Sequence, residues 1–239
     1  MKWLIALPAY NEALVLEKNV NKLVDFCQKN LKPTNWQIVI VDNASTDQTA
    51  EVGKRLAARY ENVDYIFVSQ KGKGAAIRAA WVSQTADIYC FMDADLATDL
   101  SALPRLVQAM AGGAEVVIGS RFQPQSQVKR SMIRWLVSWG YRLALKILLK
   151  TKINDAPCGF KAINQAVKTA ILPLVQNKEW FFDSELVILA EKKGYWVQEI
   201  PVIWADPREG KDKSRVKIFS LGRDYLKQIF ALRQRLKSL

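Results

Sequence analysis

The chain has 239 residues, half of them apolar, and a formal charge of +12 at pH 7. This length suffices for one sizeable domain, or for one domain with an appendage. The sequence contains no histidine, which excludes Ser-His-Asp and Cys-His catalysis and histidine-ligated zinc. Its three widely spaced cysteines form no disulfide or zinc pattern, so we expect packing residues in a reducing compartment. Any chemistry must therefore rely on carboxylates, cations and a metal ion.

The positive charge is concentrated in one segment. Residues 116–154 contain no Asp or Glu but eight Lys or Arg. A solvated surface normally mixes both signs, so we expect this segment to face something negative. The sequence also has no apolar run of 18 residues and no signal peptide at its start. We therefore expect a protein that neither spans a membrane nor is exported.

Hydrophobic periodicity in the first half predicts strands that alternate with helices. The predicted strands are residues 1–8, 37–42, 64–69 and 87–92, and the helices between them are residues 11–30, 48–60 and 75–85. This alternation predicts an α/β fold with a Rossmann-like, doubly wound, mainly parallel sheet. Ligands of such sheets bind beyond the carboxyl ends of the strands, where Pro8, Asp42 and Asp93 lie.

The second half is less regular. It predicts a helix that contains Pro104 and ends at Met110, a strand over residues 114–119, and then the basic segment. A helix over residues 181–193, a strand over 196–204 and a cationic C-terminal helix follow. We divide the chain into a main domain, residues 1–215, and an amphipathic basic helix, residues 216–239.

Two carboxylates separated by one residue, Asp93 and Asp95, follow the apolar strand 88–92. Hard oxygen ligands at the end of a buried strand suit Mg²⁺ or Mn²⁺, which takes one or two carboxylates and completes its shell with water and substrate phosphates. The alternative is a solvated turn, because Asp is a common turn residue.

Several motifs occur together in a defined order and resemble the family 2 glycosyltransferases of GT-A fold. They are residues 7–12 (Leu-Pro-Ala-Tyr-Asn-Glu), 41–47 (Val-Asp-Asn-Ala-Ser-Thr-Asp), 71–75 (Lys-Gly-Lys-Gly-Ala) and 93–95 (Asp-Ala-Asp). Residues 119–121 (Gly-Ser-Arg), 158–161 (Cys-Gly-Phe-Lys) and 182–186 (Phe-Asp-Ser-Glu-Leu) narrow the resemblance. Together they look like the polyprenyl-phosphate hexosyltransferases, the dolichyl-phosphate glucose and mannose synthases. The resemblance covers residues 3 to 217.

The resemblance implies a nucleotide-sugar site and a metal site. Asp93 and Asp95 would hold Mg²⁺ or Mn²⁺ against the donor diphosphate, and the donor would contact Pro8, Tyr10, Glu12, Asp42, Lys71, Gly74 and Ala94. Lys73 is the alternative to Lys71 for the phosphate contact. A glutamine common in mannose synthases two residues after the second Asp is replaced here by Ala97. This departure favours UDP-glucose over GDP-mannose. Glu12 has the alternative role of an acid that stabilises a helix N-terminus.

The acceptor follows from electrostatics and from the resemblance. A sugar hydroxyl needs a general base, whereas a phosphate monoester is already largely dianionic at neutral pH and needs cations instead. The resemblance places Arg121, Arg130, Arg134 and Arg215 near the acceptor phosphate, with Arg121 also counted as catalytic. Arginine suits bidentate phosphate contact. The alternative for each is a solvated surface arginine.

Two amphipathic stripes are typical of a membrane surface. The first contains Met132, Trp135, Leu136, Trp139, Leu143 and Ile147, and the second contains Ile218, Leu221, Tyr225, Ile229, Leu232 and Leu236. The alternative is packing on the core or on a partner subunit, and for the first stripe we favour membrane contact. We therefore expect a peripheral protein on the cytoplasmic membrane face.

Two other functions compete with an inverting hexosyl transfer to polyprenyl phosphate. A family 2 enzyme with a soluble sugar or protein acceptor would need a base, which Asp183 or Glu185 could supply. A non-catalytic nucleic-acid-binding protein is supported only by net charge, because no DNA- or RNA-binding motif accompanies it. We therefore expect no nucleic-acid partner.

Overall fold

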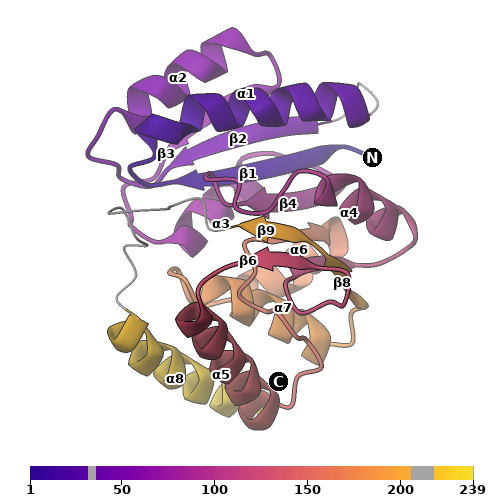
Figure 1. Cartoon of the computed structure of the whole chain (residues 1–239). Helices are drawn as coiled ribbons and strands as arrows, with labels where there is room; N and C mark the ends of the chain where they lie inside the picture. The colour runs from indigo at the N-terminus through magenta and orange to yellow at the C-terminus, as the bar shows by residue number, and fades with distance from the viewer. Residues whose placement is uncertain (32–35, 206–217, 239) are drawn as a thin grey trace.

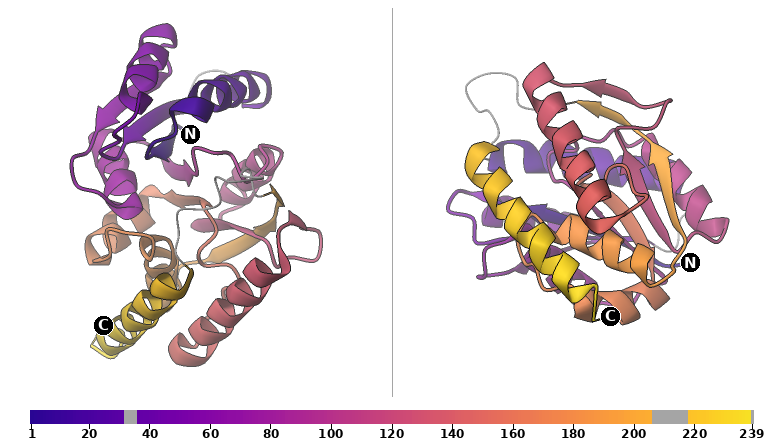
Figure 2. Two further views of the ribbon diagram at one scale, coloured as in Figure 1. Left: turned by 60° about the vertical axis from the view of Figure 1, so that its left-hand side comes forward. Right: turned by 90° about the horizontal axis from the view of Figure 1, so that it is seen from below.

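The computed structural model describes residues 1–31, 36–205 and 218–238; within residues 218–222 only the backbone is described. It contains a mainly parallel sheet covered by helices, as the sequence predicts (Figure 1). The two chain ends lie on different sides of the molecule (Figure 2).

The main sheet has seven strands. Their order across the sheet is β3 (Val63–Phe67), β2 (Trp36–Asp42), β1 (Trp3–Ala9), β4 (Ile88–Met92), β7 (Phe160–Asn164), β5 (Val116–Ser120) and β8 (Val197–Pro201). Among these seven described strands, only β7 runs antiparallel to its neighbours. Because β2, β1 and β4 are adjacent and parallel, their carboxyl ends meet at one edge of the sheet. This edge holds Pro8, Asp42 and the start of the segment that contains Asp93.

Helices α1 (Ala13–Asn30) and α2 (Thr49–Arg59) pack against each other, and α2 contacts β2 and β3. Helix α3 (Lys73–Ser83) packs on β1 and β2 from the other side of the sheet (Figure 1). Right-handed crossovers that run in opposite directions along a sheet place their helices on opposite faces. On that side α3 contacts α7 (Phe182–Lys192), which in turn contacts α6 (Gln165–Ile171). Helix α4 (Ala102–Ala111) packs on β5 and β8.

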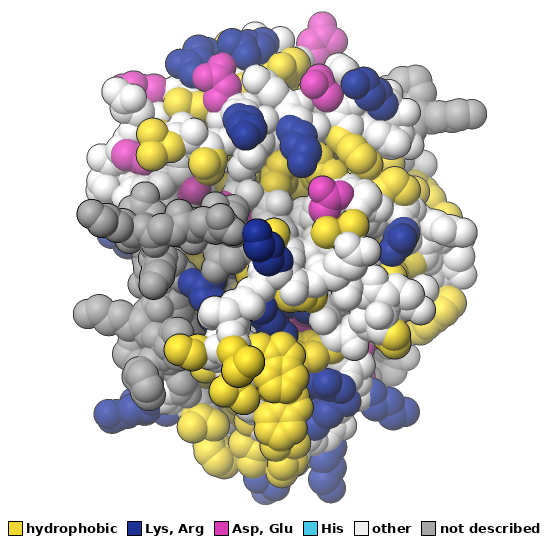
Figure 3. Space-filling model, viewed as in Figure 1, with side chains coloured by type: hydrophobic (Ala, Val, Ile, Leu, Met, Phe, Trp, Pro, Cys, Tyr) yellow, Lys and Arg dark blue, Asp and Glu magenta, His cyan; other side chains and the backbone are white. Residues whose placement is uncertain are grey.

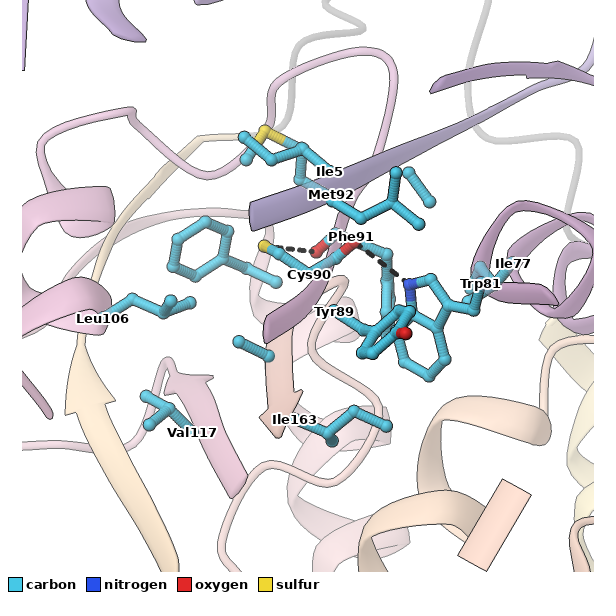
Figure 4. Close-up of a cluster of buried hydrophobic side chains, with 14 of the residues drawn as sticks. Ile5, Ile77, Trp81, Tyr89, Cys90, Phe91, Met92, Leu106, Val117 and Ile163 are labelled. Atoms are coloured by element: carbon cyan, nitrogen blue, oxygen red, sulfur yellow. Dashed lines mark hydrogen bonds between the residues drawn. The ribbon is translucent and has the colours of Figure 1, made fainter. Parts of the chain in front are cut away.

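Strand β4 crosses the centre of the core. All five of its residues are buried, because apolar side chains cover both of its faces. Trp81 of α3 packs at 5.9 Å from the ring of Phe91, and its Nε1 donates to the Cys90 carbonyl at 3.2 Å (Figure 4). Cys27, Cys90 and Cys158 are all free and buried, which confirms that they are packing residues. A rigid β4 fixes the position of the residues that leave its carboxyl end.

The structure corrects the prediction of one strand over residues 196–204. Two strands occur there, β8 and β9 (Ile203–Ala205), and β9 pairs with β6 (Gln127–Lys129) in a separate sheet. The break lies at Val202, whose N–H donates to Ser126 Oγ and whose carbonyl accepts from Gln127 N, both at 3.0 Å. Pro201, which has no N–H to continue the ladder, comes directly before it.

Two long helices, α5 (Met132–Leu149) and α8 (Ile218–Arg235), lie side by side at one end of the molecule (Figures 1 and 2). Tyr141 of α5 and Tyr225 of α8 pack with ring centroids 5.0 Å apart. Ile229 and Leu232 of α8 are buried, so this part of the second amphipathic stripe packs on the protein itself. Among the described residues, every helix is too short or too polar to cross a membrane.

Candidate active site

The loops after β1 and β2 are joined by side-chain hydrogen bonds. Asn11 adopts a left-handed φ of 54°, its N–H donates to Ser45 Oγ at 3.0 Å, and its Oδ1 accepts from Thr46 N at 2.7 Å. Glu12 precedes α1, and its N–H donates to Thr49 Oγ1 at 2.9 Å. The motifs at residues 7–12 and 41–47 therefore form one structural unit beside the strand ends.

Asp42 ends β2 as a fully buried carboxylate. It accepts from Ser45 N and from the Tyr65 hydroxyl, both at 3.0 Å, and burial together with this bond raises the pKa of Tyr65 to about 12. Each carboxylate oxygen has a second lone pair. Asp42 can therefore accept from a ligand while it holds its own loop.

Two predicted donor contacts meet at the protein surface. Tyr10 is exposed, and the Lys71 ammonium lies 5.4 Å from the centre of its ring. Pro8 lies at the end of β1, half-buried, opposite Val41 in the register. An aromatic face beside a cation suits a nucleoside with an attached phosphate.

The Gly72–Gly74 loop opens α3 against the segment that precedes α7. Gly72 has a φ of +135°, and a Cβ there would overlap the Lys178 carbonyl oxygen. A Cβ on Gly74 would lie 2.5 Å from Phe182 Cβ. These glycines allow α3 to begin in close contact with residues of α7. Gly74 thus has a packing role here in addition to its predicted place near the donor.

Lys73, between these glycines, bridges two carboxylates. Its Nζ lies 2.7 Å from Asp93 Oδ1 and 2.7 Å from Asp183 Oδ2. Burial opposes the charge of Lys73, but Asp183 and Asp93 together outweigh it and raise the pKa of the ammonium. Asp183 Oδ1 is buried and has no hydrogen-bond partner among the described residues. The structure thus brings Asp93 together with two residues that lie 20 and 90 positions away in the sequence.

Asp93 has the surroundings of a metal ligand. Its side chain is 37% exposed, and the space beside its carboxyl group exists because residue 159 is glycine: a Cβ there would lie 2.7 Å from Asp93 Oδ1 and closer to Oδ2. Asp95 Oδ1 accepts from Ala97 N at 3.1 Å, and the Ala94 carbonyl accepts from Asn19 Nδ2 at 2.9 Å. The described part of the chain holds no group of three or more acidic or Cys ligands for a metal. Asp93 and Asp95 offer the one or two carboxylates that a cation such as Mg²⁺ takes from a protein, with water and substrate phosphates completing its shell.

Arg121, which is partly buried, forms an ion pair with the fully buried Asp155. Its Nε and Nη2 donate to the two Asp155 oxygens at 2.8 and 2.7 Å, and its backbone N–H donates to Oδ2 at 2.7 Å. Burial opposes the cation, but Asp155 and, more weakly, Asp93 raise the pKa of Arg121. Glu199 holds the loop from behind by accepting from Asp155 N at 2.9 Å. Arg121 thus lies within the electrostatic reach of Asp93.

A group of cations surrounds Phe122 next to Arg121. The guanidinium carbons of Arg130 and Arg142 lie 5.4 and 4.8 Å from the centre of the Phe122 ring. Burial and the neighbouring Arg121 lower the pKa of Arg130, because like charges disfavour one another. Arg134 lies in the first turn of α5. Arg215, the fourth predicted acceptor arginine, lies outside the described residues.

The two carboxylates considered as general bases are both engaged. Asp183 pairs with Lys73. Glu185 is buried and accepts from Gln176 N, Asn177 N and Arg235 Nη1 at 3.1, 2.8 and 2.5 Å. Glu185 therefore fixes the segment before α7 and the end of α8.

Sequence reasoning did not identify four parts of this site. Lys73 appeared only as an alternative to Lys71, and the partners Asp155, Gly159 and Lys161 received no role. Lys161 is fully buried, donates to the Cys158 carbonyl and lies 5.3 Å from the centre of the Phe91 ring. The available signal was the segment 155–161, whose Asp, Gly and Lys are unusual in a run that otherwise reads as apolar.

The family model described as glycosyl transferase family 2 matches residues 4–170. Among curated proteins, the chain is 29% identical over 240 residues to a dolichyl-phosphate beta-glucosyltransferase of Saccharomyces cerevisiae. This match covers 92% of this chain and 72% of the yeast protein. The chain is also 29% identical over 225 residues to glycosyltransferase AglD of Haloferax volcanii. That match covers 93% of this chain but only 36% of the archaeal protein.

A solved structure shares the fold. It is glucosyl-3-phosphoglycerate synthase from Mycobacterium tuberculosis in complex with Mn²⁺, uridine diphosphate and glucosyl-3-phosphoglycerate, with a TM-score of 0.69 and 17% sequence identity. The match covers 98% of this chain and 79% of the mycobacterial chain.

Proposed function

The chain belongs to glycosyl transferase family 2, and we propose that it moves a hexose from a nucleoside diphosphate sugar to a polyprenyl phosphate. Glucose is the favoured hexose, because Ala97 replaces the glutamine of the mannose synthases and the yeast relative is named a glucosyltransferase. The observation that carries the proposal is that the partly exposed Asp93 lies within electrostatic reach of Arg121, and that Arg121 neighbours Arg130, which lies just before a helix with exposed apolar side chains.

The donor occupies the carboxyl ends of β1, β2 and β4 in this proposal. The nucleoside lies against Tyr10 and Asp42, and the diphosphate extends toward Asp93 past the Gly72–Gly74 loop. Asp93 and Asp95 would hold Mg²⁺ or Mn²⁺, which would supply positive charge against the departing nucleoside diphosphate. The mycobacterial neighbour binds Mn²⁺ and uridine diphosphate, which supports a metal and a uridine donor in this fold.

The acceptor phosphate binds at the arginine group. Arg121 and Arg130 are partly buried cations close enough to disfavour each other, and a dianionic phosphate removes that repulsion. Phosphate oxygen attacks C1 of the hexose from the face opposite the leaving group. A bond forms between C1 and the acceptor oxygen, the bond between C1 and the diphosphate breaks, and the configuration at C1 inverts. The acceptor carries no proton to remove, so the engagement of Asp183 and Glu185 in ion pairs is no obstacle.

The polyprenyl chain requires a membrane surface next to this site. The six residues of the α5 stripe are all exposed, with side chains between 41% and 78% accessible: Met132, Trp135, Leu136, Trp139, Leu143 and Ile147. Apolar side chains gather over α5 with Lys and Arg around them (Figure 3). Tryptophans beside cations suit the interface of an anionic membrane. We propose that α5 binds the cytoplasmic membrane face and that Arg134, on the same helix, faces the lipid phosphate.

The proposal is tested by incubating the purified protein with labelled UDP-glucose or GDP-mannose, a polyprenyl phosphate and Mg²⁺ or Mn²⁺. We expect a glycosylated lipid in the organic extract with UDP-glucose, and its loss on addition of EDTA. The matched control replaces polyprenyl phosphate by the polyprenol without phosphate, which needs a base to react. Equal transfer to the polyprenol, or efficient transfer to a water-soluble sugar, would contradict a phosphate acceptor.

A further inference from the structure

Lys73 has a fixed position between an inner and an outer carboxylate. The side chains of Lys73 and Asp183 are 7% and 3% exposed, whereas that of Asp93 is 37% exposed. Ala75 N donates to the Lys178 carbonyl at 2.9 Å and Gly74 N to the Glu179 carbonyl at 3.3 Å, so the backbone beside Lys73 is held against another segment. The 2.7 Å contact with the buried Asp183 holds the ammonium on the inner side if Asp93 turns toward solvent.

The buried Asp183 makes the ammonium indispensable. Lys73 is the ion-pair partner of Asp183, and Asp183 Oδ1 lacks a hydrogen-bond partner within the described structure. An uncompensated buried carboxylate is strongly unfavourable. Lys73 thus remains charged and in place whether or not Asp93 binds something else.

We propose that Lys73 is a positioning residue that makes metal binding at Asp93 depend on the nucleoside diphosphate. A divalent cation on Asp93 shares that carboxylate with a buried ammonium, and the two cations repel each other. The diphosphate supplies the negative charge that balances both. Metal alone therefore binds weakly, and metal with nucleotide binds tightly. This inference rests on the proposed donor site and adds an order of binding to it.

The test measures Mn²⁺ binding by calorimetry and by the electron paramagnetic resonance of free Mn²⁺, with and without UDP. In Lys73→Met we expect Mn²⁺ alone to bind about tenfold more tightly or better, within the usual range of coupling between two sites. The gain in Mn²⁺ affinity on adding UDP should shrink, because the diphosphate no longer has a second cation to balance. The gain in UDP affinity on adding Mn²⁺ should shrink by the same factor, since coupling between bound ligands is reciprocal. A merely structural role of Lys73 would weaken Mn²⁺ binding in both conditions.

Two further variants make the test specific. Lys71→Met removes the same charge from the same loop, from a position over the Tyr10 ring, and should leave the affinity for Mn²⁺ alone unchanged. Lys73→Met with Asp183→Asn removes both buried charges, so it covers the case in which the single variant does not fold. The Asp183→Asn change also prevents the carboxylate that Lys73 has left unpaired from becoming a new Mn²⁺ ligand. Tighter binding of Mn²⁺ alone should persist in this double variant.

The possible failures are distinguishable. The first failure has a wild type that binds Mn²⁺ and UDP together and a double variant whose affinity for Mn²⁺ alone is unchanged or weaker. This result overturns the role of Lys73 and leaves the donor site standing. A wild type that binds no UDP at any Mn²⁺ concentration overturns the donor site and this inference with it.

Discussion

Replacing Gly159 by alanine tests the geometry of the metal-side carboxylate most directly. A Cβ at this position would lie 2.7 Å from Asp93 Oδ1 and nearer still to Cγ and Oδ2, whereas real Cβ contacts essentially never fall under 3.0 Å. The Asp93 carboxylate must therefore move away and lose its 2.7 Å contact with Lys73. A displacement on the order of 1 Å at a reacting site can cost about 10²-fold in rate. We expect transfer to fall by about that factor, which corresponds to about 2.7 kcal/mol of transition-state stabilisation.

Stability should change little in the same variant. Gly159 does not have a positive φ, so alanine is compatible with its backbone, and the part that must move is the end of a partly exposed side chain. We expect a change in unfolding free energy within about 1 kcal/mol, measured by urea denaturation. The assay compares kcat and KM for the donor with the affinity for UDP in the presence of Mn²⁺.

Gly140→Ala is the matched control, because an added Cβ at Gly140 meets no atom within 4 Å. Alanine in the middle of α5 should stabilise the protein by about 0.4 to 1 kcal/mol and leave turnover with a short soluble acceptor analogue unchanged. Near-normal transfer by Gly159→Ala would refute the argument that this glycine shapes the Asp93 site. So would a loss of activity accompanied by a large loss of stability.

Three other predictions concern the metal, the buried arginine and the membrane. Asp95→Asn should lower transfer by at least about 10²-fold with the fold intact, because an amide is a poor ligand for a hard cation; full activity of this variant, or of wild type in EDTA, would contradict a metal role. Arg121→Ala should lower the unfolding free energy by about 3 to 5 kcal/mol, because it leaves the buried Asp155 uncompensated; a urea melt like that of wild type would show that the pair is not needed. Substituting Trp135 and Trp139 together by Ser should weaken sedimentation with anionic liposomes, most clearly at high salt, where charge attraction is screened. It should change thermal stability little, since both side chains are nearly half exposed, and a stability loss of several kcal/mol with unchanged liposome binding would instead indicate a core role.

The sequence predicted the first half of the fold well because local patterns determine it. Strands β1 and β4 are continuous apolar runs and β2 is apolar from Ile38 to Val41, and the short links between alternating elements allow few topologies. Strand β7 was not predicted. Its five residues include the polar Lys161 and Asn164, and it becomes a strand by pairing antiparallel with β4 and β5, which lie far away in the chain. Such nonlocal pairing leaves no periodic signal in so short a segment.

The same distinction holds for the site. Asp93 was predicted because it ends a buried strand. Its link to Asp183 through Lys73 spans 110 residues in the sequence, and no pattern marks it. Arg121 was predicted to contact the acceptor phosphate because residues 119–121 resemble a motif of the polyprenyl-phosphate hexosyltransferases. The structure adds that its guanidinium is held by Asp155 at two atoms, which depends on how the loop of residues 154–155 is folded by Glu199.

Three consecutive residues of α7 contact three separate parts of the molecule. Asp183 pairs with Lys73 of the donor side, the Ser184 hydroxyl accepts from the Tyr141 hydroxyl of α5 at 2.8 Å, and Glu185 pairs with Arg235 of α8. The outer faces of α5 and α8 are therefore free to diverge as the protein adapts to other lipids or acceptors, whereas their inner faces must continue to match this tripeptide. We expect evolutionary change of acceptor specificity to accumulate on the exposed sides of these two helices, and residues 183–185 to change only together with their partners.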